Sequence, residues 1–407
     1  MESIQRLHWW QHGPALEHLV RDLVAAELTA ARPGRVMALP ALWSADLDLA
    51  ADLGADSLDM MGAATSLADL LGFARAGCQD ALLARTRLAD WIAAARASLA
   101  VDDSALTFRT SGSSGAPKRC THGLAGLWRE VDELARLVPG RRRIFSAVPA
   151  HHIYGFLFTV LLPQAGGGAL PVLELRGASP AALAAQVQPG DLVVAHPDFW
   201  GQVAALAPRF AQDVIGVSSG APCPDATARM LHEGGLRLLQ MYGSSETAGV
   251  GWRDAAGAPY RLLPYWRRGA RENTLERPVS GASECFTLQD RLDWLDGERF
   301  VPAGRIDQAV QVGGTNVHPG YVAEVLAQHP GVRECAVRLM RPDEGARLKA
   351  FVVPADGYPP MALREELDGW LAERLLPPER PAAVSFGPAL PRQPGGKPAD
   401  WVIDAWE

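Results

Sequence analysis

Apolar residues recur at helical spacing along the first quarter of the chain. Between residues 16 and 24 they lie at positions i, i+3, i+4, i+7 and i+8, which places them on one face of a helix. The segment 88–95 repeats this spacing, with Trp91 and Ile92 on the apolar face. Few strand-like patterns occur before residue 100, so residues 1–100 are expected to form a helical region.

The pattern changes between residues 103 and 304. Short apolar runs at 144–148, 191–195 and 213–217 are typical of buried strands, whereas 123–137 has helical spacing. Alternating strands and helices predict an α/β fold with a mainly parallel sheet.

A smaller zone follows at residues 305–407 and predicts a compact α+β domain. It contains strand-like segments at 309–312, 334–339 and 348–353 and a helical segment at 361–375. Segments rich in proline and glycine predict loops at 259–264, 354–360 and 387–396.

Composition narrows the class of protein. The 407 residues are 48% hydrophobic and 21% charged, which is typical of a soluble globular protein with two or three domains. The net charge is −7 and no basic block stands out, so nucleic acid is not expected as a partner. The longest apolar run, 153–163, is too short to span a bilayer. Five scattered cysteines and the lack of a signal-peptide pattern favour a cytoplasmic location.

A segment rich in glycine and hydroxyl side chains is the sharpest local signal. It follows a strand-like run and reads Thr110-Ser-Gly-Ser-Ser-Gly-Ala-Pro-Lys118. Glycines let backbone N–H groups approach an anion, hydroxyls add donors, and the lysine supplies positive charge. Unlike a Walker A loop, it has a proline before the lysine and no Ser or Thr after it. The alternative is an ordinary polar turn. The candidate phosphate-binding residues are Thr110, Ser111, Gly112, Ser113, Ser114, Gly115 and Lys118.

Five further motifs follow this loop in a fixed order. They are Pro149-Ala-His-His-Ile-Tyr-Gly155, Ser219-Gly-Ala-Pro222, Tyr242-Gly-Ser-Ser-Glu-Thr247, Asp290 with Gly304-Arg-Ile-Asp307, and Leu390-Pro-Arg-Gln-Pro-Gly-Gly-Lys397. Together with the loop they resemble the motifs of the adenylate-forming superfamily. This superfamily includes acyl- and aryl-CoA synthetases, peptide-synthetase adenylation domains and luciferases. Six ordered motifs over residues 106–397 are more specific than any one of them.

The resemblance implies a role for each matched residue. Glu246 would hold Mg²⁺, Ser245 would donate to the α-phosphate of ATP, and His152 would lie on the substrate side. Lys397 would bridge the substrate carboxylate and the phosphate, and Asp307 would be the hinge of a mobile lid. The remaining residues implied in nucleotide binding are Ser219, Gly220 and Ala221 beside adenine, Tyr242 stacked on it, Gly243, Asp290 at the ribose hydroxyls, and Arg305.

Simpler structural roles stay open for these residues. Glu246 could be an acid that complements a helix N-terminus. Asp290 could be a surface acid, and Lys397 a solvated charge in a loop rich in proline and glycine. His151 and His152 could be satisfied core histidines.

The family usually has a large α/β region before the phosphate loop, and here a different motif stands in its place. Asp52-Leu-Gly-Ala-Asp-Ser-Leu-Asp-Met-Met61 resembles the attachment site of acyl carrier proteins, whose serine carries 4′-phosphopantetheine. Ser57 would be the modified residue, near the N-terminal end of a helix. An N-capped helix without modification is the alternative. The residues after Met61 depart from the surface that carriers show to their partner enzymes.

These observations predict an α/β fold with a truncated adenylate-forming core and parallel sheets. The expected domains are a helical, carrier-like region at 1–100, an adenylation core at 103–304 and a mobile α+β lid at 305–407. The expected cofactors are ATP and Mg²⁺. The acceptor would be a phosphopantetheine thiol on CoA, on a separate acyl carrier protein or on Ser57, and the last would require a phosphopantetheinyl transferase.

The predicted activity is activation of an aryl or medium acyl carboxylic acid as acyl-AMP, followed by transfer to that thiol. In its short chain length the protein resembles AMP-ligases of pigment and polyketide pathways, which belong to secondary metabolism. One alternative is a non-catalytic nucleotide-binding or carrier-docking module with the same fold. Another is a ligase that uses an amine or hydroxyl acceptor.

Overall fold

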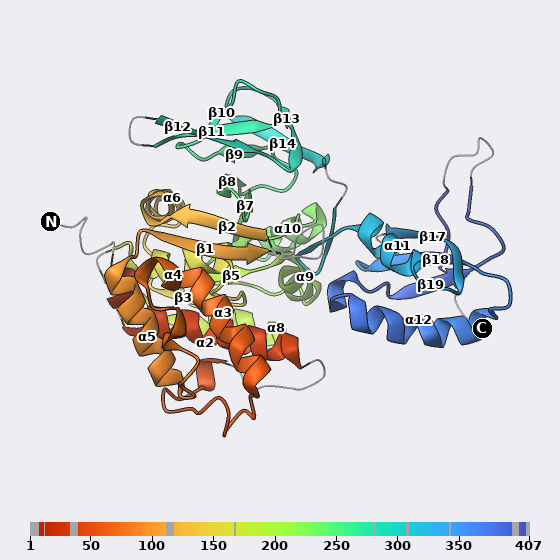
Figure 1. Cartoon of the computed structure of the whole chain (residues 1–407). Helices are drawn as coiled ribbons and strands as arrows, with labels where there is room; N and C mark the ends of the chain where they lie inside the picture. Colours follow the sequence, from red (N-terminus) through yellow and green to blue (C-terminus); the bar gives the residue numbers. More distant parts are fainter. Residues whose placement is uncertain are drawn as a thin grey trace. The chain divides into compact units, whose positions relative to one another are not determined.

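A computed structural model describes most of the chain in two compact units (Figure 1). The described residues are 8–11, 13–32, 40–110, 118–166, 168–279, 282–306, 309–341, 343–392 and 399–403. Among them, the first unit contains residues up to 110, 118–288 and 293–301. The second unit contains residues 289–292 and those from 302 onward.

The first unit begins with helices whose apolar faces are buried, as the spacing predicts. Helix α2 spans Gly13–Ala31, and its stripe from Leu16 to Val24 is at most 5% exposed. Helix α3 starts at Ser57 because Asp56 and Asp59 form a capping box that satisfies free backbone N–H groups. The other elements of this region are α4 (Phe73–Ala76), α5 (Leu88–Val101), and the 3₁₀ turns η1 (Trp9–Gln11), η2 (Pro40–Leu42) and η3 (Gln79–Ala81).

These helices pack directly against the rest of the first unit. Strands β1 (Ala105–Thr110) and β2 (Lys118–Gly123) form an antiparallel pair, and α3 lies against β1. Arg109 of β1 donates a 2.6 Å hydrogen bond to the Ser66 hydroxyl of α3. A separate carrier-type domain is therefore not observed, because α3 shares its core with the hairpin.

A nine-stranded sheet forms the centre of the first unit, in the order β13-β14-β9-β8-β7-β6-β5-β3-β4. Strands β4, β3, β5, β6 and β7 run parallel, whereas β7, β8, β9 and β14 pair antiparallel. The mainly parallel sheet expected from sequence is thus a mixed sheet. The parallel strands are β3 (Arg143–Ser146), β4 (Val172–Glu174), β5 (Asp191–Ala195), β6 (Ile215–Ser218) and β7 (Arg237–Ser244).

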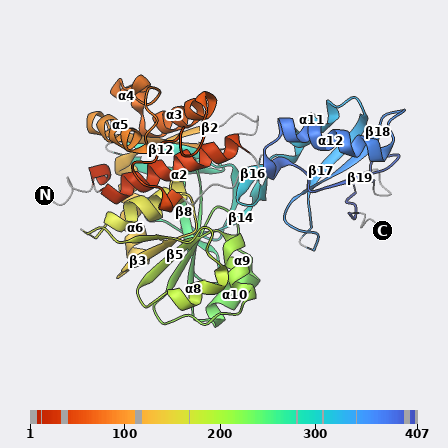
Figure 2. The ribbon, with the colours of Figure 1, turned by 90° about the horizontal axis from the view of Figure 1, so that it is seen from below.

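Helices cover both faces of the parallel strands. Figure 2 shows α8 (Pro180–Gln186), α9 (Pro197–Ala205) and α10 (Asp225–Glu233) on one side and α2 to α5 on the other. Trp200 of α9 and Leu231 of α10 are fully buried against Val193 of β5 in the core on the first side. Helix α6 (Leu124–Leu137) follows β2, close to its predicted bounds.

The antiparallel strands, some of whose residues (290–292 and 302–305) belong to the second unit, are elements that the sequence pattern did not predict. They are β8 (Ala248–Arg253), β9 (Tyr260–Leu262), β13 (Asp290–Trp294), β14 (Arg299–Arg305), and a three-stranded sheet of β10 (Arg267–Arg268), β11 (Thr274–Val279) and β12 (Ala282–Thr287). The expected loop at 259–264 therefore contains a short strand, which pairs with β8 and β14.

The second unit is an α+β domain, as the sequence pattern indicates. Helices α11 (Pro319–Ala327) and α12 (Pro360–Arg374) pack against a three-stranded sheet. That sheet consists of β17 (Val332–Leu339), β18 (Leu348–Pro354) and β19 (Ala383–Phe386). The unit also holds β15 (Val310–Val312), β16 (Thr315–Val317) and the 3₁₀ turn η6 (Pro377–Glu379).

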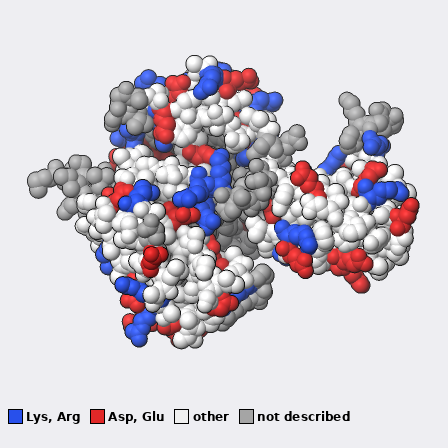
Figure 3. All heavy atoms as spheres, viewed as in Figure 1, with Lys and Arg blue, Asp and Glu red and all other residues white. Residues whose placement is uncertain are grey.

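The apolar run after residue 153 folds as a buried helical segment. It consists of α7 (Ile153–Gly155), a π-helix η4 (Phe156–Leu161) and the 3₁₀ turn η5 (Leu162–Gln164). None of the helices in the described ranges is long and apolar enough to cross a membrane. On the face of each unit seen in Figure 3, basic and acidic side chains are interspersed.

Candidate functional site

The parallel strands of the first unit end at one edge of the sheet, where most of the predicted motifs lie. The His151–His152 motif follows β3, the Ser219–Gly220–Ala221 segment follows β6, and Ser245 and Glu246 follow β7. Ligands of open α/β sheets bind outside the carboxyl ends of the strands. The fold therefore brings together motifs that are far apart in sequence.

The β1–β2 hairpin places Lys118 at this site. Thr110 and Lys118 are paired across the hairpin, so the two ends of the predicted phosphate loop are adjacent. The Lys118 ammonium lies 2.8 Å from the Glu246 carboxylate, although 128 residues separate them in sequence. Lys118 is half exposed and Glu246 is 27% exposed, so both remain accessible to a ligand.

The pair controls the charge of Glu246. Partial burial raises the pKa of this carboxyl, but the hydrogen bond and charge of Lys118 outweigh burial and lower the pKa overall. Glu246 is therefore ionised at neutral pH. Carboxylate oxygens are the ligands that Mg²⁺ prefers, so Glu246 fits the metal-binding role that the family resemblance implies.

His122 connects the hairpin to the motif after β7. Its Nε2–H donates a 2.7 Å hydrogen bond to the backbone carbonyl of Ser245. Burial lowers the pKa of His122, which favours the neutral imidazole. No sequence motif assigns a role to His122. The feature that could have identified it is the alternation of β2, where His122 is buried and its neighbours Thr121 and Gly123 are exposed.

The β7–β8 turn is held by its own side chains. Ser244 and Thr247 hydroxyls lie 3.1 Å apart, and the Thr247 backbone N–H donates to Ser244 Oγ at 3.3 Å. Gly243 faces β8 so closely that a Cβ would lie 2.2 Å from the Ala248 carbonyl oxygen. Glycine is required there, because any larger residue would displace the turn that carries Ser245 and Glu246.

Tyr242 lies inside an aromatic group at the end of β7. Its ring centroid is 5.7 Å from that of Tyr260 and 5.3 Å from that of Phe300. These contacts fix the ring by edge and tilted packing. Stacking of Tyr242 on adenine stays a prediction.

The buried carboxyl of Glu130, on α6, supports the β7–β8 hairpin. Glu130 is 3% exposed and accepts a 2.8 Å hydrogen bond from the Gly249 N–H of β8. Tyr265 and Trp266 donate to the carbonyl of the same glycine at 2.9 and 2.7 Å. Burial raises the pKa of Glu130 to about 7, although these donors lower it in part.

The segment after β6 is tied to the neighbouring strand. The Ser219 hydroxyl donates a 3.2 Å hydrogen bond to the Met241 carbonyl of β7. Gly220 and Ala221 follow in the same loop. Their predicted position beside adenine is compatible with this edge of the sheet and stays a prediction.

The histidine motif after β3 presents one exposed ring and one partly buried ring. His152 is exposed and His151 is intermediate, and their ring centroids lie 4.6 Å apart. Burial, with the nearby charges of His152 and Arg176, lowers the pKa of His151 well below its usual value. Burial also lowers the pKa of His152.

The aromatic side chains after this motif pack in the interior. Phe156 contacts Trp9 and Phe108, with ring centroids 5.2 and 5.5 Å away. The Tyr154 hydroxyl donates to the carbonyls of Ala195 and Val217. These residues form core contacts under the sheet edge.

Asp290 and Arg305 come together in the second unit. Arg305 Nη1 lies 3.8 Å from Asp290 Oδ1, and both side chains are about one-fifth exposed. Their assignment to ribose and phosphate binding stays a prediction. Predicted residues that lie outside the described ranges are Ser111, Gly112, Ser113, Ser114, Gly115, Asp307 and Lys397.

Ser57 is exposed at the first position of α3, next to Leu58, which is 77% exposed. Its helix is capped by Asp56 and Asp59, which is the structural alternative considered for this motif. The geometry leaves the hydroxyl accessible.

Two family models match the chain. The model described as AMP-binding enzyme matches residues 42–282, and the model described as AMP-binding enzyme C-terminal domain matches residues 321–397. The first match includes Ser57 and α3, so the segment expected to be carrier-like lies largely within the AMP-binding region. The two matches correspond to the larger and smaller units.

Curated relatives match over nearly the whole chain. A 4-coumarate–CoA ligase of Rhodobacter capsulatus is 40% identical over 95% of this chain and 100% of the relative. Another, from Halorhodospira halophila, is 38% identical over 93% of this chain and 97% of the relative. The expectation of a truncated core is not supported, because these relatives match along their full length without a larger region before the phosphate loop.

A solved structure of an o-succinylbenzoate CoA synthetase from Bacillus subtilis shares the fold. Its TM-score is 0.59 at 17% identity, over 72% of this chain and 67% of the other. At this identity the likeness concerns the architecture alone.

Proposed function

The chain belongs to the AMP-binding enzyme family and is an AMP-forming acid–thiol ligase, and from this premise we propose that it joins a hydroxycinnamate-type acid to the thiol of CoA. The foremost candidate acid is 4-coumarate, because two relatives matched along nearly their whole length are 4-coumarate–CoA ligases.

Two half-reactions make up this activity. In the first, a carboxylate oxygen attacks the α-phosphorus of ATP, and pyrophosphate leaves. In the second, the thiol gives up its proton and attacks the acyl carbon, a thioester forms, and AMP leaves. Negative charge accumulates on phosphate oxygens in the first step, so cations and N–H donors must be aimed at them.

The Lys118–Glu246 pair is the observation that carries the catalytic proposal. It joins the end of the phosphate loop to the motif after β7 with a 2.8 Å contact. When ATP is bound, we expect Lys118 to turn toward the phosphates and Glu246 to hold Mg²⁺, which supplies charge neutralisation. A lysine and a carboxylate brought together from separate motifs can divide these tasks, whereas an isolated surface ion pair adds little stability.

The other roles follow from position. Ser245 begins the turn after β7, and its backbone carbonyl accepts the hydrogen bond from His122. Its hydroxyl is proposed to contact the α-phosphate. His152, exposed beyond β3, is proposed to contact the acid. Lys397 is assigned by resemblance as the cation that bridges the acid and the α-phosphate, with Asp307 as the hinge of the second unit.

Free CoA is the proposed acceptor thiol. An acyl carrier protein is the alternative, and attachment of phosphopantetheine to the exposed Ser57 is a further one. Intact-mass spectrometry after incubation with a phosphopantetheinyl transferase and CoA tests the attachment to Ser57. An unchanged mass, with a known carrier modified in parallel, removes Ser57 from consideration.

The test of the function is ATP–pyrophosphate exchange with 4-coumarate, cinnamate, benzoate, 4-hydroxybenzoate and straight-chain acids, followed by mass detection of CoA thioesters. We expect exchange with hydroxycinnamates and a CoA thioester of the same acid. No exchange with any acid, in protein that binds ATP, would contradict the proposal. Exchange without a thioester would contradict only the choice of acceptor.

Two substitutions test the site residues. Lys397→Ala should lower the exchange rate at least about a hundredfold while ATP binding is largely kept, because the substitution removes a cation that stabilises the negative charge of the transition state. Glu246→Gln should weaken the dependence of the rate on Mg²⁺. Glu373→Gln is the control, because Glu373 is an exposed partner of Arg374 in the second unit. Near-normal exchange in Lys397→Ala would remove it from the catalytic site.

A further inference from the structure

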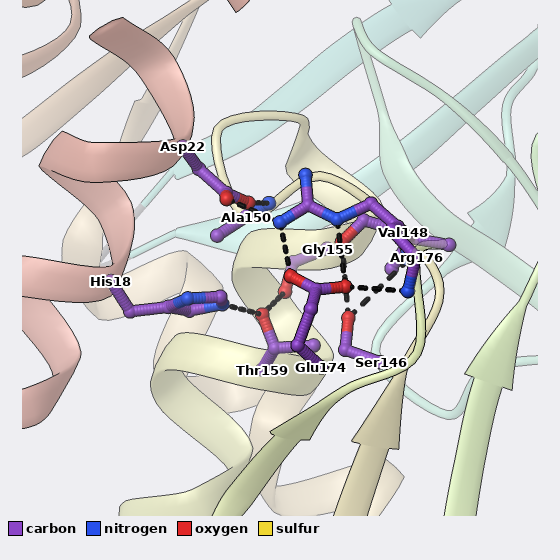
Figure 4. Close-up of polar contacts among 9 residues, drawn as sticks. All are labelled: His18, Asp22, Ser146, Val148, Ala150, Gly155, Thr159, Glu174 and Arg176. Carbon is purple, nitrogen blue, oxygen red and sulfur yellow. Dashed lines mark hydrogen bonds and ion pairs between the residues drawn. The ribbon is translucent and has the colours of Figure 1, made fainter. Parts of the chain in front are cut away.

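Asp22 on α2 is a buried carboxylate that hydrogen-bonds to the backbone of the loop carrying the two histidines. Asp22 is 1% exposed, and its Oδ2 accepts a 2.6 Å hydrogen bond from the Ala150 N–H (Figure 4). Ala150 immediately precedes His151 and His152. No local motif marks Asp22, because its partner lies 128 residues away.

The second oxygen of Asp22 is also occupied. It contacts the Arg176 guanidinium, which Glu174 at the end of β4 holds through both carboxylate oxygens. The Arg176 backbone N–H donates a further 2.8 Å hydrogen bond to Glu174. This arrangement, here called the Asp22–Arg176–Glu174 network, joins α2, the end of β4 and the loop after β3 (Figure 4).

The loop that carries the histidines is fixed at three points. At its start, the Ser146 hydroxyl donates to the Val148 carbonyl at 3.0 Å. At its centre, Ala150 donates to Asp22. At its end, Gly155 lies so close that a Cβ would be 1.9 Å from the Pro149 carbonyl oxygen. Asp22 holds this loop from outside the segment 146–155 at the N–H directly before the two histidines, and the Tyr154 hydroxyl holds its end through the Ala195 and Val217 carbonyls.

A buried carboxylate with a partner for each oxygen is costly to desolvate, and a hydrophobic pair of similar size could often replace it at little loss of stability. Its geometry, in contrast, is specific. A charged acceptor forms a stronger and shorter hydrogen bond to a backbone N–H than a neutral one. We therefore expect this network to position the histidine loop rather than to add much to the stability of the fold.

We propose that Asp22 is a positioning residue that sets the place of His151 and His152 through the Ala150 N–H. It does not touch the reacting atoms. This proposal rests on the proposed function only in assigning His152 to the substrate side. Misplacement of a positioned group by about 1 Å can cost about a hundredfold in rate.

Other ionisable groups face the same region. They are His18 and Arg21 on α2, Arg176 and Glu174 beyond β4, and His151 and His152 themselves. His18 Nε2 lies 3.4 Å from the Thr159 hydroxyl of η4, which in turn donates to the Gly155 carbonyl. Burial lowers the pKa of His18, although Asp22 and Glu174 raise it in part. Among these groups, Arg176 is the cation that Asp22 pairs with directly, and Glu174 shares it.

The test compares two substitutions of nearly equal size. Asp22→Asn keeps an oxygen that can accept from Ala150, and Asp22→Leu does not. Both remove the same charge, and both leave Arg176 paired with Glu174. The control is Glu17→Gln, because Glu17 lies on the same helix and its carboxylate pairs with Arg21 at 3.1 Å.

We expect Asp22→Asn to keep about a third or more of the ATP–pyrophosphate exchange rate, and Asp22→Leu to lose about ten- to a hundredfold in kcat with the KM for ATP unchanged. Glu17→Gln should match the unmodified protein. Equal rates in the Asn and Leu variants, whether high or low, would overturn the proposal. So would a loss confined to the KM for ATP.

A second readout is independent of activity. The imidazole signals of His151 and His152, assigned in ¹⁵N-histidine protein by His→Gln substitution, should shift in Asp22→Leu and stay near their original positions in Asp22→Asn. Unchanged signals in Asp22→Leu overturn positioning even if the chain activates no acid in the panel. If Asp22→Leu fails to fold, Asp22→Glu takes its place, because an acid one methylene longer displaces Ala150. Unchanged signals and rate in Asp22→Glu would also overturn the proposal.

Discussion

The buried carboxyl of Glu130 makes a specific prediction about how stability depends on pH. Burial raises its pKa from 4.5 to about 7 in the folded chain. The folded state therefore holds this proton more tightly than the unfolded state. The stabilisation is fully present below the unfolded pKa of 4.5 and is lost as pH rises through about 7.

The size of the effect follows from the shift. Each pH unit of pKa difference corresponds to about 1.4 kcal/mol, so the shift of Glu130 corresponds to about 3 kcal/mol. Glu130→Gln removes the ionisation and keeps an oxygen that can accept from the Gly249 N–H. The free energy of unfolding of the unmodified protein, minus that of Glu130→Gln, should therefore fall by about 2.5 kcal/mol from pH 5 to pH 8, because the unfolded carboxyl is already partly ionised at pH 5.

Urea unfolding followed by circular dichroism at several pH values, with both proteins at the same ionic strength, measures this difference. Other ionisable groups titrate in both proteins, so the subtraction isolates Glu130. A difference that is constant with pH, or that rises with pH, would refute the reasoning. Either result would mean that Glu130 is ionised in the folded chain, with its charge balanced by the donors around Gly249.

Two further substitutions test packing in each unit. Gly243→Ala should destabilise the first unit by about 1–3 kcal/mol and lower adenylation, because its Cβ would meet the Ala248 carbonyl at 2.2 Å. Gly62→Ala is its control: no atom lies within 4 Å of the added Cβ, so stability in thermal unfolding should hold or rise. Lys349→Met should destabilise the second unit by about 3 kcal/mol, because fully buried Lys349 donates to Glu344 at 2.7 Å and to the Trp401 carbonyl at 2.6 Å. Unchanged denaturant midpoints in these two variants would contradict the packing.

Much of the regular structure could be predicted from local patterns. Strand β5 has the predicted bounds, α6 differs from its predicted range by one residue at its start, and α12 differs by one residue at each end. Such elements have strong apolar periodicity, and their faces are buried as that periodicity requires. The antiparallel strands β8, β9 and β14 were missed because their sequences mix polar, glycine and aromatic residues without a clear alternation. Their pairing, rather than their composition, makes them strands.

The residues of the site divide in the same way. The glycine-rich loop, Glu246 and His152 were predicted as site residues because their neighbours in sequence form recognisable motifs. His122 and Asp22 were missed because each acts through a backbone group more than 120 residues away, the Ser245 carbonyl and the Ala150 N–H. The carrier-like region was expected from a short motif, whereas α3 packs on β1 and lies within the AMP-binding match.

The amino-acid sequence by itself determined the order of the motifs, the family they resemble and the positions of the main helices and strands. These depend on local spacing and on the chemistry of single segments. Only the tertiary structure decided that Lys118 meets Glu246, that Glu130 is buried under β8, and that Asp22 holds the loop before His152. Each of these contacts joins residues more than a hundred positions apart, and such pairings arise from the packing of the whole unit rather than from any local preference.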